Sequence, residues 1–292
     1  MMTNKHYEEF MKIAIIEAKT SLKEGNKGFG AVVAKDGRVI ASAHDTEVMD
    51  QDSIAHAEIK AIRKASKIYR KDLTGCLIIS THEACPMCTG SIIWSNISEV
   101  VYGVSIRDSI KAGRNMINLS CKEIIKKSNA DINIQDGILK KECLKLYNND
   151  IRGLVRKFRT IKKSEWINIE EDLFNKRMQW YENNKTMVRK LKGNDLKKAY
   201  HLILMKIGIK NSEAPIVKKS ENKIIFHSKN YCPSLETCII LDLDTREVCK
   251  EIYERPTEDL IRRLNPKLRF TRNYECIRPY SDYCEEIIIL EK

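Results

Sequence analysis

The chain has 292 residues, 42% of them hydrophobic, with ten cysteines, so it can form two domains and is too long for a small disulfide-stabilised scaffold. The formal net charge of +12 favours anionic partners without requiring them. No secretion signal opens the chain and no run approaches the roughly 20 apolar residues of a membrane helix, so we expect a cytoplasmic protein with reduced thiols and no membrane partner.

The chain begins with an amphipathic pattern and then turns β-rich. Within residues 3–28, apolar side chains recur at near-helical spacing, which predicts a helix, and Gly25 lies beyond its end. Two short β-rich runs then flank Asp36 and Gly37. Asp-Gly between such runs predicts a β-hairpin, because both residues accept the positive φ of a tight turn.

Helices and strands alternate in the segment that follows. Ser53 is predicted to cap a helix over residues 54–71. Residues 76–80 read as a buried strand, 86–94 as a helix and 99–104 as another strand. This alternation predicts an α/β sandwich with a partly parallel sheet.

A basic run at residues 152–163 marks the predicted domain boundary, which gives domains 1–163 and 164–292. Two long helical stretches and then short elements predict an α+β second domain. It contains five cysteines at irregular gaps: Cys232, Cys238, Cys249, Cys276 and Cys284. A metal or iron–sulfur site there has no motif to support it, and packing as small buried hydrophobes is the default interpretation.

Three side chains of the first domain have the character of zinc ligands. Cys85 and Cys88 lie at the start of a helix opened by Pro86, where the helix dipole stabilises thiolates. His56 supplies a third ligand from the preceding helix. Zinc with three protein ligands keeps a fourth position for water, whose pKa falls to about 7 on the metal.

Glu58 is too close to His56 in the sequence to be a natural fourth ligand on the same helical face. Its carboxylate can instead take a proton from the water and return it, which is general base and acid work. Two alternatives stay open, a structural zinc site completed by His44 or His82 and a redox Cys-x-x-Cys. The order of the parts, His-x-Glu on a helix and then Cys-x-x-Cys at a helix start, favours a catalytic site.

These residues resemble the cytidine deaminase superfamily, in the branch of guanine, cytosine and tRNA-specific adenosine deaminases. The likeness covers about residues 5–160 and includes "GFGAVVAKDGRVIA", "AHAEIKAIRK", "ACPMCTGSIIW" and "GILKKECLKLY". It implies a three-layer α/β/α sandwich with a mixed five-stranded sheet, and usually a homodimer. It also implies Zn²⁺ on His56, Cys85 and Cys88, with Glu58 as proton shuttle, in a hydrolytic deaminase of a nucleobase or similar heterocycle.

The sequence departs from the family pattern in three places. Ala84 replaces the usual proline before the first cysteine, which removes no ligand. Asp45 stands where the family commonly has an asparagine, so a substrate that Asp45 contacts should present N–H donors. The stretch 114–116 lacks the aspartate of bacterial guanine deaminases, which argues against guanine.

We expect the substrate to be held by four residues: Phe29, Asp45, Ala57 and Trp94. Phe29 resembles the aromatic residue that stacks on a small base in those enzymes, and a core position is its competing interpretation. Asp45 has the alternative of facing solvent or capping its loop.

Two other functions are open. The basic tail at 152–163 favours a tRNA-specific adenosine deaminase as second choice, and a non-catalytic zinc-containing binding module comes third. The second domain is similar to the L-2-amino-thiazoline-4-carboxylate hydrolase family in three short motifs, "YCPSLETC", "LNPKLRF" and "DYCEE". These motifs are short, so no catalytic residue is carried over.

Overall fold

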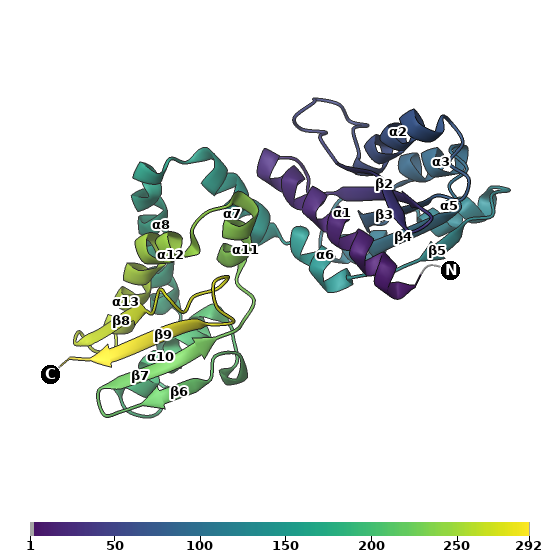
Figure 1. Ribbon diagram of the computed structural model, residues 1–292. Coiled ribbons are helices and arrows are strands. Elements are labelled where there is room, and N and C mark those ends of the chain that lie inside the picture. The colour runs from purple at the N-terminus through teal and green to yellow at the C-terminus, as the bar shows by residue number, and fades with distance from the viewer. Residues whose placement is uncertain (1–2, 292) are drawn as a thin grey trace. The chain divides into compact units, whose positions relative to one another are not determined.

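The computed structural model describes residues 3–291 and divides the chain into two compact units (Figure 1). The first unit ends at Arg156 and the second begins at Lys157, so the division falls inside helix α7 (Asn149–Thr160). The sequence pattern puts this boundary slightly later, at the end of the basic run.

One mixed sheet forms the centre of the first unit. Its strands within residues 3–156 are β1 (Gly30–Lys35), β2 (Arg38–His44), β3 (Leu77–His82), β4 (Glu99–Val104) and β5 (Asn133–Gln135), in the order β2-β1-β3-β4-β5. β1 pairs antiparallel with β2 and β3, whereas β4 runs parallel to both β3 and β5. The mixed five-stranded sheet predicted from the sequence is confirmed.

Helices cover both faces of this sheet (Figure 1). Besides α7 they are α1 (Asn4–Glu24), α2 (Ala57–Tyr69), α3 (Pro86–Trp94), α4 (Ile106–Lys111), α5 (Cys121–Lys127) and α6 (Lys140–Leu146). α1 and α6 pack on one face, while α2, α3 and α5 enclose the main core on the other. Val33, Ile78 and Val100 point into that core, so the central strands are buried on both sides as a three-layer sandwich requires.

Local turn and cap chemistry fixes where the elements near the site begin. Asp36 and Gly37 adopt φ values of 50° and 74°, which is the predicted hairpin turn. Helix α3 starts at Pro86 as predicted, with Cys85 as its N-cap. The prediction of Ser53 as a cap is wrong, because residues 52–55 form a turn of their own and His56 is the N-cap of α2.

The second unit is an antiparallel sheet with helices. Its strands are β6 (Ile216–Lys219), β7 (Lys223–Ser228), β8 (Leu268–Arg272) and β9 (Cys284–Leu290), in the order β6-β7-β9-β8. Its longer helices are α8 (Trp166–Asn183), α10 (Asp195–Ile207), α11 (Pro233–Leu241) and α13 (Arg255–Arg262). Its short helical segments are η1 (Lys163–Glu165), α9 (Lys185–Val188), η2 (Asn211–Glu213), α12 (Thr245–Val248) and the π-helix η3 (Cys249–Glu254).

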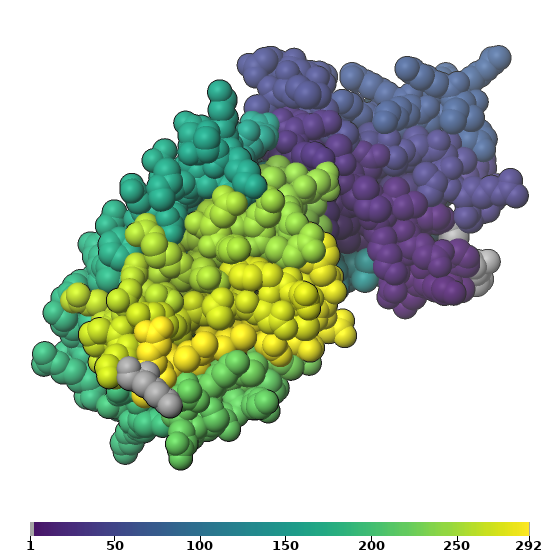
Figure 2. Space-filling model, turned by 60° about the vertical axis from the view of Figure 1, so that its left-hand side comes forward, coloured from purple at the N-terminus to yellow at the C-terminus, as the bar shows by residue number. Residues whose placement is uncertain are grey.

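The core of this second unit lies between its sheet and α10, where Phe226, Phe270 and Ile288 meet Leu196 and Ile203. In the space-filling view the C-terminal segment, in yellow, lies at the surface beside the green segment that carries β6 and β7 (Figure 2). The α+β class predicted for the C-terminal domain is confirmed. Across residues 3–291, none of the helices combines the length and apolarity needed to cross a bilayer.

Candidate active site

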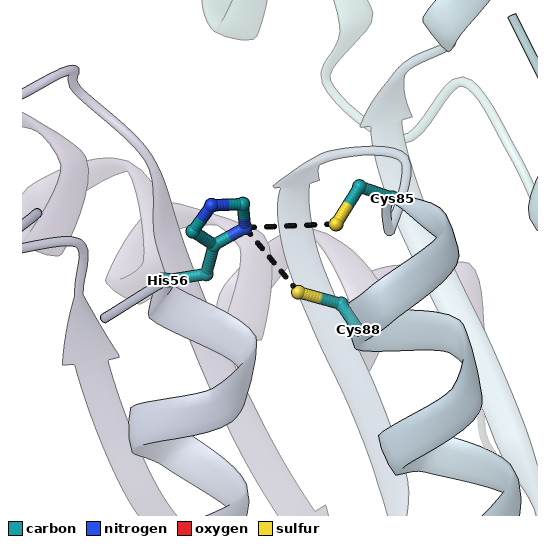
Figure 3. Close-up of side chains that lie close together, drawn as sticks. All are labelled: His56, Cys85 and Cys88. Atoms are coloured by element: carbon teal, nitrogen blue, oxygen red, sulfur yellow. Dashed lines mark hydrogen bonds between the residues drawn. The ribbon is translucent and has the colours of Figure 1, made fainter. Parts of the chain in front are cut away.

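Three potential metal ligands meet at the ends of two neighbouring helices. His56 precedes α2, Cys85 precedes α3, and Cys88 lies in the first turn of α3. His56 Nδ1 is 3.6 Å from Cys85 Sγ and 3.5 Å from Cys88 Sγ, and all three side chains point toward one another (Figure 3). Within residues 3–291 they are the one group of three or more such side chains close enough to share an ion.

This spacing fits a tetrahedral zinc ion. Zinc lies about 2.3 Å from thiolate sulfur and about 2.0–2.1 Å from imidazole nitrogen, so tetrahedral angles put sulfur and nitrogen about 3.6 Å apart. The two separations at His56 Nδ1 match that value. Two thiols and one imidazole are also a donor set that zinc prefers, so the residues present fit the metal.

The electrostatics of the thiol pair favour one thiolate. Hydrogen bonds from Cys88 and from His56 lower the pKa of Cys85 to about 4. The pKa of Cys88 is raised, chiefly by its hydrogen bond with Cys85 and by burial. On the other side of the imidazole ring, Glu47 Oε2 lies 3.7 Å from His56 Nε2, where a carboxylate can orient a ligand histidine.

Glu58 is a buried carboxyl group in the first turn of α2, with only 6% of its surface exposed. Its Oε2 lies 3.6 Å from Cys88 Sγ, so it is beside the candidate ligands without being one of their group. Burial raises the pKa of Glu58 to about 7, and the charge of Cys85 acts in the same direction. A group of this kind can both accept and donate a proton near neutral pH.

The two histidines that could have closed the metal site have other partners. His44 contacts Glu17 through Nδ1 at 2.6 Å and Glu24 through Nε2 at 2.9 Å. His82 contacts the Glu83 carbonyl at 2.8 Å and Ser109 Oγ at 2.6 Å. Neither joins the group of His56, which leaves that group with three protein ligands among the described residues.

A pocket of about 600 Å³ opens beside these groups, within the range of about 300–1,000 Å³ usual for small-molecule sites. Its walls carry both the candidate ligands and charged side chains. The lining residues are Lys27, Phe29, Glu47, Ser53, His56, Glu58, His82, Glu83, Cys85, Met87, Gly113, Arg114, Asn115, Met116, Ile117, Asn149 and Arg152. A small molecule in this pocket would therefore lie against Glu58.

Of the four residues expected to hold the substrate, only Phe29 lines the pocket. Phe29 lines the pocket, with its ring 5.4 Å from those of His82 and Tyr147. Ala57 is fully buried in the core between the sheet and α2, and Trp94 is 87% exposed at the end of α3. Neither of them lines the pocket.

Asp45 is 1% exposed and lies behind the pocket wall. Its carboxylate accepts hydrogen bonds from Ser21 Oγ at 2.5 Å, Lys27 N at 2.9 Å and Phe29 N at 2.8 Å. Both oxygens are thus used in holding the loop that positions Phe29. Of the two interpretations of Asp45, this geometry therefore agrees with capping of the loop and not with contact to the substrate.

Two arginines of the pocket were not recognised from the sequence as site residues. In the sequence, Arg114 is only the first residue of the stretch 114–116 that departs from the family pattern, and Arg152 is only the start of a basic run. They come from different segments, a loop after α4 and helix α7, and meet only in the folded chain. Their positive charge was the available signal, and the sequence offers many such charges.

The candidate metal site and the comparisons together indicate a class of enzyme, the deaminases. Residues 4–104 match the family described as "Cytidine and deoxycytidylate deaminase zinc-binding region". The guanine deaminase of Bacillus subtilis is 38% identical over 110 residues, which are 37% of this chain and 70% of that protein. The tRNA-specific adenosine deaminase of the same organism is 34% identical over 158 residues, 54% of this chain and 96% of that protein.

A solved structure of the Bacillus subtilis guanine deaminase is 38% identical and covers 36% of this chain and 69% of its own, with a TM-score of 0.35. The chain belongs to the cytidine and deoxycytidylate deaminase family, and it is a hydrolytic deaminase. The family model matches only the first unit, so the similarity of residues 164–292 to thiazoline-carboxylate hydrolases stays a prediction.

Proposed function

We propose that the protein deaminates an amino-substituted nitrogen heterocycle, with one zinc ion held by His56, Cys85 and Cys88. The observation that carries this proposal is the convergence of these three ligand atoms, all within 4.8 Å of one another, on a pocket that Glu58 also lines. Zinc bound there would supply a water activated for attack, because the metal lowers the pKa of water to about 7.

Glu58 is the proton carrier in this proposal. Its carboxylate takes one proton from the attacking water and delivers it to the ring nitrogen beside the amine-bearing carbon. The oxygen of water bonds to that carbon, and the second proton of the water passes through Glu58 to the amine. The carbon–nitrogen bond then breaks and ammonia leaves, so the net reaction consumes one water and yields a carbonyl compound.

The surroundings of Glu58 support this role. The side chain is buried beside Cys88, so bulk water does not compete for its protons. Phe29, His82 and Met87 provide apolar and aromatic walls on which a planar ring can rest. Burial holds His82 neutral by lowering its pKa to about 4, so its ring adds no positive charge to the pocket.

The test compares the wild type with Glu58→Gln in an ammonia-release screen over bases, nucleosides, pterin-like rings and triazine-like rings. Glutamine keeps the shape but cannot carry the proton, so we expect ammonia release to fall at least about 100-fold. The zinc content should stay at the wild-type level, because Glu58 is outside the ligand group. Glu142→Gln, at an exposed position of α6, is the matched control. Undiminished turnover in Glu58→Gln would refute the role.

A tRNA-specific adenosine deaminase is the second candidate. Similarity over 96% of the Bacillus subtilis tRNA-specific enzyme favours it, together with the basic residues of α7. Such an enzyme must hold a loop base of a folded RNA. If ammonia forms from small rings while no inosine forms in a supplied tRNA, this candidate is excluded.

We further propose that the protein works in the cytoplasm as a homodimer. Each of the ten cysteines carries a free thiol, as expected in a reducing compartment. The dimer rests on the family resemblance, and sedimentation at several protein concentrations tests it. A monomer at all of them would contradict the proposal.

A further inference from the structure

Two guanidinium groups in the pocket have no acidic partner. Arg114 and Arg152 both line it, and neither side chain makes a hydrogen bond or ion pair with any residue in the described part of the chain, 3–291. Nη1 of Arg114 is buried and unpaired. An unpaired buried guanidinium is costly, because it has lost its hydration without gaining a hydrogen-bond acceptor.

The position of Arg114 is set by packing. Its guanidinium carbon lies 5.0 Å from the centre of the Phe29 ring and 4.9 Å from that of Tyr147. Stacking on two aromatic rings holds a planar guanidinium in one orientation. The group is therefore preorganised for a ligand, so little conformational entropy is lost when one binds.

The two charges act on each other. Burial lowers the pKa of Arg114, and the charge of Arg152 lowers it further. Burial also lowers the pKa of Arg152. Asp45 is the acidic residue whose charge favours both guanidinium ions, but its two oxygens already accept three hydrogen bonds.

The other charges of the pocket do not supply the missing anion. Glu47 lies 2.6 Å from Lys27, so these two side chains neutralise one another. The carboxylate of Glu83 accepts hydrogen bonds from the backbone of Ile106 and Cys121. The thiolate of Cys85 and the carboxyl group of Glu58 remain, and both belong to the proposed metal and proton-transfer centre. Two cations without acidic partners therefore lie next to Glu58, and an anion bound from outside the chain would offset the cost of leaving them unpaired.

We propose that the substrate carries an anionic group, a carboxylate or a phosphate, which Arg114 and Arg152 bind while the amine-bearing ring carbon faces Glu58. This inference rests on the proposed function. It narrows the substrate class to amino-substituted heterocycles that carry a negative charge and disfavours neutral free bases as substrates. Guanidinium groups match both anions because their planar fork can donate two parallel hydrogen bonds. A pocket of about 600 Å³ accommodates a ring together with such a substituent.

The test measures binding of matched neutral and anionic rings by titration calorimetry, to the full chain carrying Glu58→Gln so that nothing is consumed. The carboxylate arm pairs cytosine with cytosine-5-carboxylate and 2-aminopyrimidine with its 5-carboxylate. The phosphate arm pairs cytidine and guanosine with their 5′-monophosphates. Each pair is repeated with Arg114→Gln, Arg152→Gln and the charge-matched control Arg63→Gln, whose side chain is exposed on α2.

We expect the anionic member of at least one arm to bind about 10- to 100-fold more tightly, the size of one or two charged hydrogen bonds. Arg114→Gln and Arg152→Gln should each remove most of this preference, Arg114→Lys should restore part of it, and Arg63→Gln should keep it. Circular dichroism verifies that the variants fold. The arm that responds identifies the group as carboxylate or phosphate.

The proposal is overturned if no pair shows the preference, if both arginine variants keep it, or if the Arg63 control loses it equally. Editing of a tRNA without any preference among the small rings also overturns it. Failure of the proposed function looks different, because the anionic preference would persist while the wild type releases ammonia from no member of the panel.

Discussion

Replacement of Asp45 by asparagine separates a structural role from a role in substrate contact. In the structure one oxygen accepts from Ser21 Oγ and Phe29 N, and the other from Lys27 N. Whichever way the amide is turned, its NH₂ group faces a donor. Asp45→Asn therefore loses at least one charge-assisted hydrogen bond and leaves a buried N–H or O–H unpaired.

The expected cost is about 1.5–3 kcal/mol, the range for hydrogen bonds to charged groups. For a unit of this size that corresponds to a fall of about 3–12 °C in the thermal midpoint. Calorimetry measures this shift, and hydrogen exchange should show faster exchange at the amides of Lys27 and Phe29. Asp36→Asn is the matched control, because it makes the same change at an exposed turn where asparagine tolerates positive φ.

The opposite pattern would refute this reasoning. If Asp45→Asn leaves the thermal midpoint and the two amides unchanged but abolishes substrate binding, Asp45 contacts the substrate. The structure predicts that the folded variant still binds substrate below its melting temperature, because Asp45 does not line the pocket.

Three further predictions concern stability and metal content. Gly103→Ala should lower the thermal midpoint by an amount equivalent to about 1–3 kcal/mol, because the added Cβ would lie 2.5 Å from Cys143 Sγ in α6. Gly90→Ala is the control and should not lower the midpoint, because no atom lies within 4 Å of its added Cβ. Equal midpoints for the two variants would contradict this packing. Hydrogen bonding to Glu17 raises the pKa of His44 above 6.5, and the same contact lowers that of Glu17 below 4.5. The stabilising effect of the histidine is complete below about pH 6.5 and is lost as the pH rises through its folded value, while that of the glutamate is present above about pH 4.5 and is lost as the pH falls. His44→Gln should therefore lower the midpoint most between about pH 4.5 and 6.5, and a deficit that grows toward alkaline pH would be inconsistent with this pair. Cys88→Ser should reduce bound zinc well below one ion per chain by plasma mass spectrometry, and wild-type zinc content in that variant would exclude the thiol as a ligand.

Most helices and strands of the first unit can be predicted from short local sequence patterns. Asp36 and Gly37 specify a turn with two positive φ values, and Pro86 specifies a helix start, so the hairpin and α3 appear as predicted. These signals are local because they depend on the backbone preferences of one or two residues. The start of α2 was missed because Ser53 is a good cap by type, while the turn at 52–55 depends on contacts with Thr46 across the loop.

The candidate site could be predicted only in part. His56, Glu58, Cys85 and Cys88 occur as two compact motifs, so spacing alone suggested their chemistry. Arg114 has no such signal, since its importance comes from what surrounds it and from the partner it lacks. Asp45 likewise looked like a substrate contact until its hydrogen bonds showed where its carboxylate points.

The metal centre is the central claim, and zinc-edge X-ray absorption of the purified full chain tests it most directly. The account predicts one zinc per chain with two sulfur ligands at about 2.3 Å, one imidazole nitrogen at about 2.0–2.1 Å and one further light atom. In Cys88→Ser, the zinc that the variant still binds should show one sulfur ligand per ion. Four protein ligands around the ion, or a protein that binds no zinc, would contradict the account.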